Sequence, residues 1–310
     1  MTRFFHGTMT VIVLIVLGIT LIGLPASGIR VPFSQIVPKI AFYTAVLGLA
    51  IYCRYRGAER FSDAMMIVFW VGLVSDLHVF PMFVAGRSGV PYQDEMLAGF
   101  DQALGLEVTD VLALMANYPR AQELLSNIYY TLVYLMTFAL LGTTLLGKVQ
   151  AAKEYVISCA LAVAVCFPFF AAFQALGPWT QYGYAASPAQ AEFVNVMQAL
   201  RSEHVFDMDL GYVSGLICFP SFHTILAMLS GLALRTVPYV RWVALAWAAL
   251  IVFSTLTTGW HYVVDVLAGL AVAAGCVLGT RGFSRVEAKV YTQRAAEPEA
   301  QPSLTPCLAV

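Results

Sequence analysis

The sequence predicts an all-α fold, a polytopic membrane helix bundle of about eight spans. Hydrophobic residues make up 60% of the 310 residues and charged residues only 11%, and the mean hydropathy is +0.76, all far from the values of a soluble domain. Apolar stretches approaching the roughly 20 residues that cross a bilayer recur along the chain. Lys and Arg gather between alternate stretches, as the positive-inside rule requires of a multi-pass protein.

Eight spans are expected in chain order, separated by segments richer in polar residues. They cover residues 9–24, 36–53, 64–85, 126–147, 155–176, 222–237, 242–258 and 262–280. The first has a short basic flank and a small-residue tail at 24–28, so a cleaved signal peptide is the alternative for this segment. Cleavage would leave the orientation of the other spans unchanged.

The basic residues predict the orientation. With the amino terminus inside, twelve of the seventeen Lys and Arg fall in cytoplasmic segments: Arg3, Arg54, Arg56, Arg60, Lys148, Lys153, Arg235, Arg241, Arg281, Arg285, Lys289 and Arg294. We therefore expect a plasma-membrane or inner-membrane protein with both termini in the cytoplasm. The net charge of −1 and the lack of a larger basic patch argue against a nucleic-acid partner.

Two segments are not predicted to span the membrane. Between Pro91 and Pro119 apolar residues recur at helical spacing, with acidic residues elsewhere around the helix, which predicts an amphipathic helix on the outer surface. We interpret its acidic residues, Asp94 and Asp101 among them, as a solvated face over a packed one. The chain after Val290 is polar and contains proline, which predicts a disordered tail.

Two short motifs carry the chemistry. Phe-Pro-Ser-Phe-His-Thr at 219–224 and Trp-His-Tyr-Val-Val-Asp at 260–265 each stand at the outer start of a predicted span. One helical hairpin separates His223 from His261, so the two can lie side by side at one membrane interface. Asp265 follows His261 by four residues, on the same helix face. A carboxylate within a span costs a few kcal/mol on insertion scales and usually has a function.

These residue types suit nucleophilic catalysis at phosphorus. Asp265 can hold one ring nitrogen of His261, fix its tautomer and leave the other nitrogen free to attack, while His223 supplies a proton to the leaving group. Ser221 precedes the expected start of a helix, where free N–H groups favour a phosphate. Zinc is the alternative ligand of two histidines and a carboxylate, but no HExxH helix occurs, and we expect neither a metal nor a cofactor.

Residues 219–223 and 261–269 resemble the second and third signature motifs of the type 2 phosphatidic acid phosphatase superfamily. By span pattern the resemblance extends over roughly residues 126–280. It implies a six-helix core with a phosphohistidine mechanism, in which His261 is the nucleophile, Asp265 its activator and His223 the acid.

The sequence also departs from the superfamily's usual motifs. Phe222 stands where the second motif has glycine, Ser254-Thr255 stands where the third begins Ser-Arg, and no Lys-x6-Arg-Pro motif occurs. This pattern without arginines resembles the sphingolipid-synthase branch, which includes inositol phosphorylceramide synthase. Enzymes of that branch move a phosphorylated headgroup from a glycerophospholipid to a ceramide-type alcohol.

Other polar residues are open to more than one interpretation. Arg201, the basic residue of the outer loop between the fifth and sixth spans, is a candidate phosphate ligand, because guanidinium pairs well with phosphate oxygens. An arginine balanced by nearby carboxylates on a solvated loop is an equal alternative. Asp76 and His78 lie in the outer half of the third span, where they are within reach of the pocket, and we favour hydrogen bonding between helices for both.

Together these features predict a metal-independent membrane enzyme that acts on lipid headgroups at the outer face, leaning to headgroup transfer. One alternative is a simple phosphohydrolase of phosphatidic acid or an isoprenoid diphosphate. Another is a transporter in which the histidines and Asp265 relay protons. The predicted organisation is N-terminal spans (1–90), an outer surface helix (91–125), a catalytic helical core (126–285) and a cytoplasmic tail (286–310).

Overall fold

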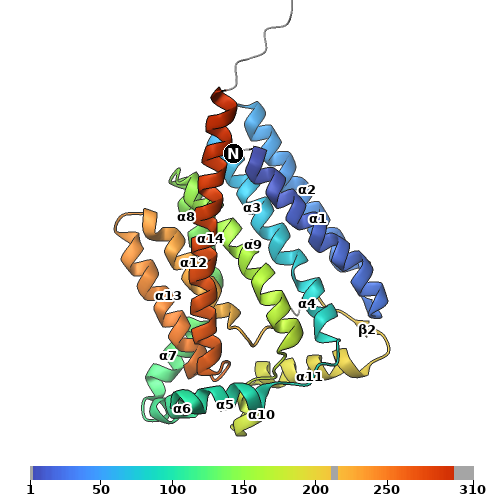
Figure 1. Cartoon of the computed structure of the whole chain (residues 1–310), viewed down its shortest axis with the longest axis vertical. Helices are drawn as coiled ribbons and strands as arrows, with labels where there is room; N and C mark the ends of the chain where they lie inside the picture. Colours follow the sequence, from blue (N-terminus) through green and yellow to red (C-terminus); the bar gives the residue numbers. More distant parts are fainter. Residues whose placement is uncertain (1–2, 211–215, 297–310) are drawn as a thin grey trace, which may run out of the picture.

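The structure, a computed structural model, is a bundle of long helices capped at one end by short ones (Figure 1). It describes residues 3–210 and 216–296, without the side chains of 3 and 287–296. The helices are α1 (Arg3–Ala26), α2 (Phe33–Tyr55), α3 (Glu59–Leu77), α4 (Val79–Gly86), α5 (Asp94–Leu104), α6 (Val108–Ala116), α7 (Pro119–Tyr129), α8 (Leu132–Leu145), α9 (Val149–Ala172), α10 (Pro178–Tyr182), α11 (Pro188–Ser202), α12 (Phe222–Ala233), the 3-10 turn η1 (Leu234–Thr236), α13 (Val240–Thr257) and α14 (Val263–Ala296). Strands β1 (Ile29–Arg30) and β2 (Phe206–Asp207) form one short parallel pair.

Six helices in the described part of the chain are long and apolar enough to cross a membrane: α1, α2, the α3–α4 pair, α9, α13 and α14. The α7–α8 pair, bent by 47°, makes a seventh if counted as one span. The predicted all-α membrane bundle is therefore confirmed, and the predicted count of eight is approximate. The difference is α12, whose twelve residues are too few to be counted as a span, although it runs within the bundle toward the turn where α13 begins (Figure 1).

The two ends of the bundle are built from different helices. At one end the start of α1 meets the later turns of α14, where the rings of Phe4 and Phe283 lie 5.0 Å apart. At the other end the short helices α5, α6, α10 and α11 lie across the bundle (Figure 1). The first turns of α12 and α14 face this covered end, so both histidine motifs lie there.

The segment predicted as one amphipathic helix forms two, α5 and α6. Gly105, with φ +66°, adopts the left-handed conformation that ends α5, a common helix stop that glycine accommodates without strain. Proline at position 119 then begins α7, because its fixed φ suits the first turn of a helix. The segment therefore turns twice across the end of the bundle.

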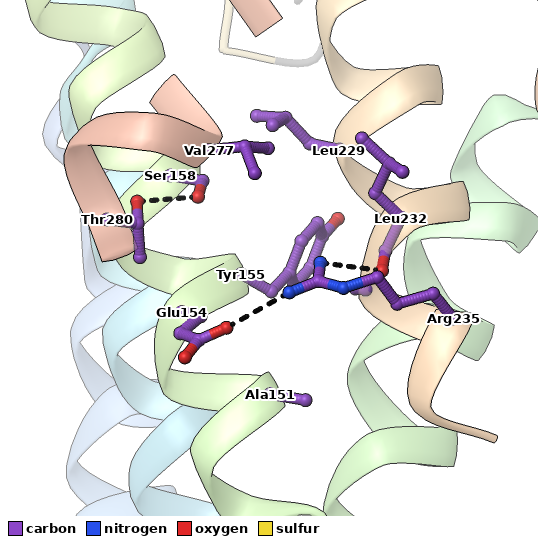
Figure 2. Close-up of a pocket in the computed structure, with 10 residues that line it drawn as sticks. Ala151, Glu154, Tyr155, Ser158, Leu229, Leu232, Arg235, Val277 and Thr280 are labelled. Atoms are coloured by element: carbon purple, nitrogen blue, oxygen red, sulfur yellow. Dashed lines mark hydrogen bonds and ion pairs between the residues drawn. The ribbon is translucent and has the colours of Figure 1, made fainter. Parts of the chain in front are cut away.

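Helix α12 lies at the centre of the bundle, against α8, α9, α13 and α14. Polar pairs between α9 and the later part of α12 and η1 reinforce this packing, and Figure 2 shows the pair of Arg235 and Glu154. Tyr155 Oη lies 3.0 Å from Ser230 Oγ, and Arg235 pairs with Glu154 at 3.4 Å. A cavity of about 20 Å³ between these side chains is the size of a single water molecule, and it lies apart from the histidine motifs.

The first eleven residues of the predicted disordered tail, 286–296, are helical. Helix α14 continues to Ala296, since 281–296 contains good helix formers and its one glycine, Gly282, lies near the start. Residues 297–310, the rest of that predicted tail, lie outside the described residues.

The close approach of α12 and α14 depends on Gly269. A Cβ atom there would lie 2.8 Å from the Ser221 carbonyl oxygen and 3.1 Å from Thr224 Cβ. We expect Gly269→Ala to destabilise the fold by about 1–3 kcal/mol, because the two helix starts would have to move apart. Thermal unfolding in detergent measures this.

Gly275→Ala on the same helix is the matched control, since its Cβ would meet nothing within 4 Å. An equal loss of stability in both variants would show that alanine destabilises helix α14 itself rather than its contact with α12.

Candidate active site

Local structure brings the starts of α12 and α14 together. Ser221 caps α12, because its hydroxyl accepts the backbone N–H of Thr224 at 3.3 Å, and this places His223 in the first helical turn. The N–H of Ser221 donates to the carbonyl of Asp265 at 3.0 Å, which ties the cap of α12 to the first turn of α14. Gly259, with φ +69°, ends the turn after α13 and leads into His261.

The hydrogen bonds of His261 assign its tautomer. Nδ1 lies 3.1 Å from the carbonyl oxygen of Cys218 and 3.4 Å from Oδ2 of Asp265. A carbonyl oxygen only accepts hydrogen bonds, so Nδ1 carries the proton and Nε2 keeps its lone pair. Burial lowers the pKa of His261 to about 4, which leaves the ring neutral at pH 7. A neutral ring with a free Nε2 is the form that can act as a nucleophile.

Asp265 is fully buried and has several donors. Its Oδ2 accepts the backbone N–H of Tyr262 at 2.9 Å and the thiol of Cys218 at 3.5 Å, both besides His261. The carboxylate thus shares the orientation of the imidazole with a backbone carbonyl, where the sequence pointed to the carboxylate alone. Cys218 belongs to the site through both its carbonyl and its thiol.

Cys218, His261 and Asp265 offer ligand atoms within 4.8 Å of one another, a spacing that can hold a metal ion. Sγ and Nδ1 are already hydrogen-bonded within the cluster, and Nδ1 carries a proton. A metal at this nitrogen would have to displace both the proton and the bond to the Cys218 carbonyl. The donors therefore fit the hydrogen-bonded arrangement better than a metal centre.

His223 and His261 line one cavity of about 390 Å³. Its other lining residues are mainly apolar or aromatic: His78, Tyr129, Tyr130, Leu132, Leu176, Trp179, Ala189, Phe193, Ile217, Cys218, Phe222, Leu226 and Trp260. The ring of His223 stacks on Tyr129, with centroids 4.4 Å apart and planes 9° from parallel, which fixes its orientation. No lysine or arginine is among the lining residues of the described chain, so the histidines are its ionisable bases.

A family model described as the PAP2 superfamily matches residues 95–278, more than half of the chain, and this range contains both histidine motifs. The chain belongs to the PAP2 superfamily. No curated protein and no solved structure matches it. The superfamily predicted from the two motifs is thus confirmed, and it supports a lipid phosphatase-type function, since PAP2 members are phosphatases or phosphotransferases.

The structure places Arg201 away from the cavity of this PAP2 protein. Its guanidinium donates to the carbonyls of Gly86 at 3.2 Å and Val90 at 2.8 Å and to the side chain of Gln174, and it lies 3.8 Å from the ring centre of Tyr92. These contacts join α11 to the end of α4 and the segment that follows. Arg201 therefore acts on protein groups here, and the two histidines have no arginine beside them in the cavity lining.

Ser221, the other predicted substrate-binding residue, is buried as the cap of α12 and is not among the cavity-lining residues. Its hydroxyl oxygen is committed to the N–H of Thr224. Its contribution in this structure is to set where α12 begins, and so where His223 points.

Two carboxylates of α5 hold the start of α14, a contribution that sequence reasoning missed. Asp101 accepts the backbone N–H groups of Val263 and Val264, both at 2.8 Å. Asp94 accepts the Tyr262 hydroxyl at 3.1 Å, and it also accepts the backbone N–H groups of 176 and 177, at 2.9 and 2.7 Å. The predicted solvated face is therefore wrong for these two residues, which are buried.

The spacing of these carboxylates contains a signal that identifies their role. Asp94 and Asp101 are seven residues apart, and Leu97 and Ala98 complete an i, i+3, i+4, i+7 stripe on the buried face of α5. An acid aligned with the apolar stripe points inward, toward a donor. Burial raises the pKa of Asp101 to about 6 while the two N–H groups oppose the shift, so the carboxyl group is ionised at neutral pH.

We expect Asp101→Asn to weaken the start of α14. An asparagine has one acceptor oxygen, so its NH₂ group would face one of the two backbone N–H donors and leave it buried without a partner, a cost of about 1–3 kcal/mol. The thermal unfolding temperature in detergent should fall. Asp110→Asn on α6 is the control, because Asp110 is exposed, and an equal effect there would contradict the capping role.

Proposed function

We propose that this PAP2 protein transfers a phosphorylated headgroup between membrane lipids through a phosphohistidine formed on His261. The observation that supports this most directly is the pair of histidines lining one cavity, with Nε2 of His261 unprotonated. Asp265 and the Cys218 carbonyl keep the proton on Nδ1 and stabilise the positive charge that the ring acquires on attack.

The first half-reaction forms the covalent intermediate. Nε2 of His261 attacks the phosphorus of a phospholipid, an N–P bond forms, and the P–O bond to the glycerol oxygen breaks. His223 takes up a proton from water when the anionic phosphate enters beside it, and it then gives this proton to the glycerol oxygen, so diacylglycerol leaves as a neutral alcohol. The stack of His223 on Tyr129 holds the ring where this transfer can take place.

The second half-reaction releases the histidine. The hydroxyl of an acceptor lipid attacks the same phosphorus, neutral His223 takes up the hydroxyl proton, and the N–P bond breaks. The product is the acceptor alcohol with the headgroup attached, and both histidines return to their starting state. Water in place of the alcohol would give hydrolysis, so the chemistry of the site supports both outcomes.

The cavity lining favours transfer, the outcome typical of inositol phosphorylceramide synthase-like enzymes. A phosphodiester headgroup carries one negative charge, and the terminal phosphate of phosphatidic acid carries up to two. A cavity without lysine or arginine suits the less charged group better. The lining residues are otherwise mainly apolar, which fits a lipid alcohol as the acceptor.

Access from the bilayer is consistent with a lipid substrate. Tyr130, at the bend between α7 and α8, lines the cavity and is also 63% exposed. The distribution of Lys and Arg supports a cavity at the extracytoplasmic end with both termini in the cytoplasm.

The decisive test is a product analysis. Purified protein is incubated with fluorescent phosphatidic acid, phosphatidylinositol and ceramide in detergent with a chelator, and the lipids are separated by chromatography. We expect a phosphorylated ceramide together with diacylglycerol, and no such product from His261→Ala, since Nε2 is the proposed nucleophile.

His204→Ala is the matched control, because His204 is exposed and outside the cavity. Free phosphate from phosphatidic acid would identify a phosphatase. Full turnover by His261→Ala would exclude the phosphohistidine, and loss of product on adding the chelator would contradict metal independence. Proton-coupled lipid movement without any product would identify the transporter.

The pH dependence tests the neutral form of His261. Because burial lowers its pKa to about 4, Nε2 is available above that pH and becomes protonated as the pH falls through it. We expect turnover to decline with an apparent pKa of about 4 on the acid side, while tryptophan fluorescence shows the protein still folded. An acid-side pKa above 6 would show that His261 is charged near neutrality.

A further inference from the structure

A third histidine lines the cavity from outside the matched family region. His78 lies in the turn that separates α3 from α4. The family match begins only at residue 95. The sequence favoured helix-to-helix hydrogen bonding for His78 and its neighbour Asp76. Asp76 does make such contacts, with Lys39 at 2.8 Å and Tyr43 at 2.6 Å, but His78 lines the cavity with His223 and His261.

One ring nitrogen of His78 is not satisfied by the protein. Nδ1 is buried and has no hydrogen-bond partner, although the carbonyls of Val74 and Ser75 on its own helix lie near the ring. A buried donor or acceptor without a partner costs about 1–3 kcal/mol, and more when the surroundings are lipid. On its other side His78 borders a second cavity, of about 60 Å³, whose other lining residues are all apolar.

A contact with Phe222 shows where His78 lies relative to the proposed reaction centre. The rings of His78 and Phe222 lie 5.8 Å apart, and Phe222 precedes His223 on α12 and also lines the cavity. The part of the cavity lining that comes from the α3–α4 turn therefore lies next to the part from α12, beside His223, the proposed proton donor. Helix α4, which follows His78, is largely buried, so the turn is held firmly.

We propose that His78 binds the phosphate of the lipid substrate by donating a ring N–H to one of its oxygens. This rests on the proposed function in taking a phosphoester as the ligand. In a cavity without lysine or arginine, a third imidazole supplies a donor that can also become positively charged beside the phosphate. Through His78, the N-terminal helices would contact the headgroup directly.

The test compares binding of two short-chain lipids that differ only in the phosphate, dioctanoyl phosphatidic acid and dioctanoylglycerol. Trp179 and Trp260 line the cavity, so tryptophan fluorescence can report the binding of both. We expect His78→Leu to weaken binding of the phosphatidic acid by about tenfold to hundredfold, the worth of one charge-assisted hydrogen bond, and to leave dioctanoylglycerol unchanged. His78→Asn and His78→Gln, which each retain an N–H donor, should restore part of the affinity.

Asp76→Asn is the control, since Asp76 is two residues away but paired outside the cavity. Unchanged phosphatidic acid binding by His78→Leu would overturn the proposal, as would equal weakening of both lipids or wild-type protein that binds them equally. If the leucine variant does not fold, His78→Phe gives the same comparison.

Turnover separates this proposal from the proposed function. Wild-type protein that binds phosphatidic acid through His78 but forms no product would refute the phosphohistidine and leave His78 as a phosphate ligand. If product formation depends on His261 but the KM is unaffected by His78→Leu, the proposed role of His78 is refuted and the phosphohistidine proposal stands. A KM raised about tenfold with little change in kcat is the result expected if both hold.

Discussion

The anchoring of the first turn of α14 is the interaction on which the rest of the site depends. Asp101 takes up the two leading N–H groups of that helix, Asp94 holds the Tyr262 hydroxyl, and the N–H of Ser221 binds the Asp265 carbonyl. A helix start otherwise leaves unpaired N–H groups, which are costly when buried. The surface helix α5 satisfies them and thereby fixes the segment that carries His261.

The site contains few charged groups, and its side chains are closely packed. Fully buried Asp265 accepts hydrogen bonds from the Tyr262 N–H and the Cys218 thiol and lies beside Nδ1 of His261, whose nearest partner is the Cys218 carbonyl. The cavity beyond it is lined by apolar and aromatic residues without lysine or arginine in the described chain, so positive charge in its lining can come only from imidazoles. Such a lining carries no permanent charge before a phosphate enters, which limits the cost of burying it in a membrane.

The pairing of His223, His261 and Asp265 could be predicted from sequence because it depends on local spacing and on the number of crossings between the motifs. The hydropathy of the spans likewise predicted the fold class. The roles of Asp94, Asp101, Cys218 and Arg201 could not be predicted in this way. The roles of Asp94, Asp101 and Arg201 depend on how α5 or α11 docks against the bundle, and the hydrogen-bond partners of Asp94 and Arg201 lie between 27 and 168 residues away in the chain. The role of Cys218 depends on how the segment before α12 lies against His261 and Asp265. For the inward face of α5, however, the apolar spacing did contain the information.

The shortness of α12 has a consequence for where the reaction takes place. Twelve residues of α-helix extend about 18 Å, and the hydrocarbon core of a bilayer is about 30 Å thick. With its far end near one membrane surface, α12 stops well below the other, and His223 in its first turn is recessed from bulk water. In the proposed transfer, two lipids would exchange a headgroup without either one leaving its leaflet, and water would have to enter a cavity lined mainly by apolar and aromatic side chains to compete.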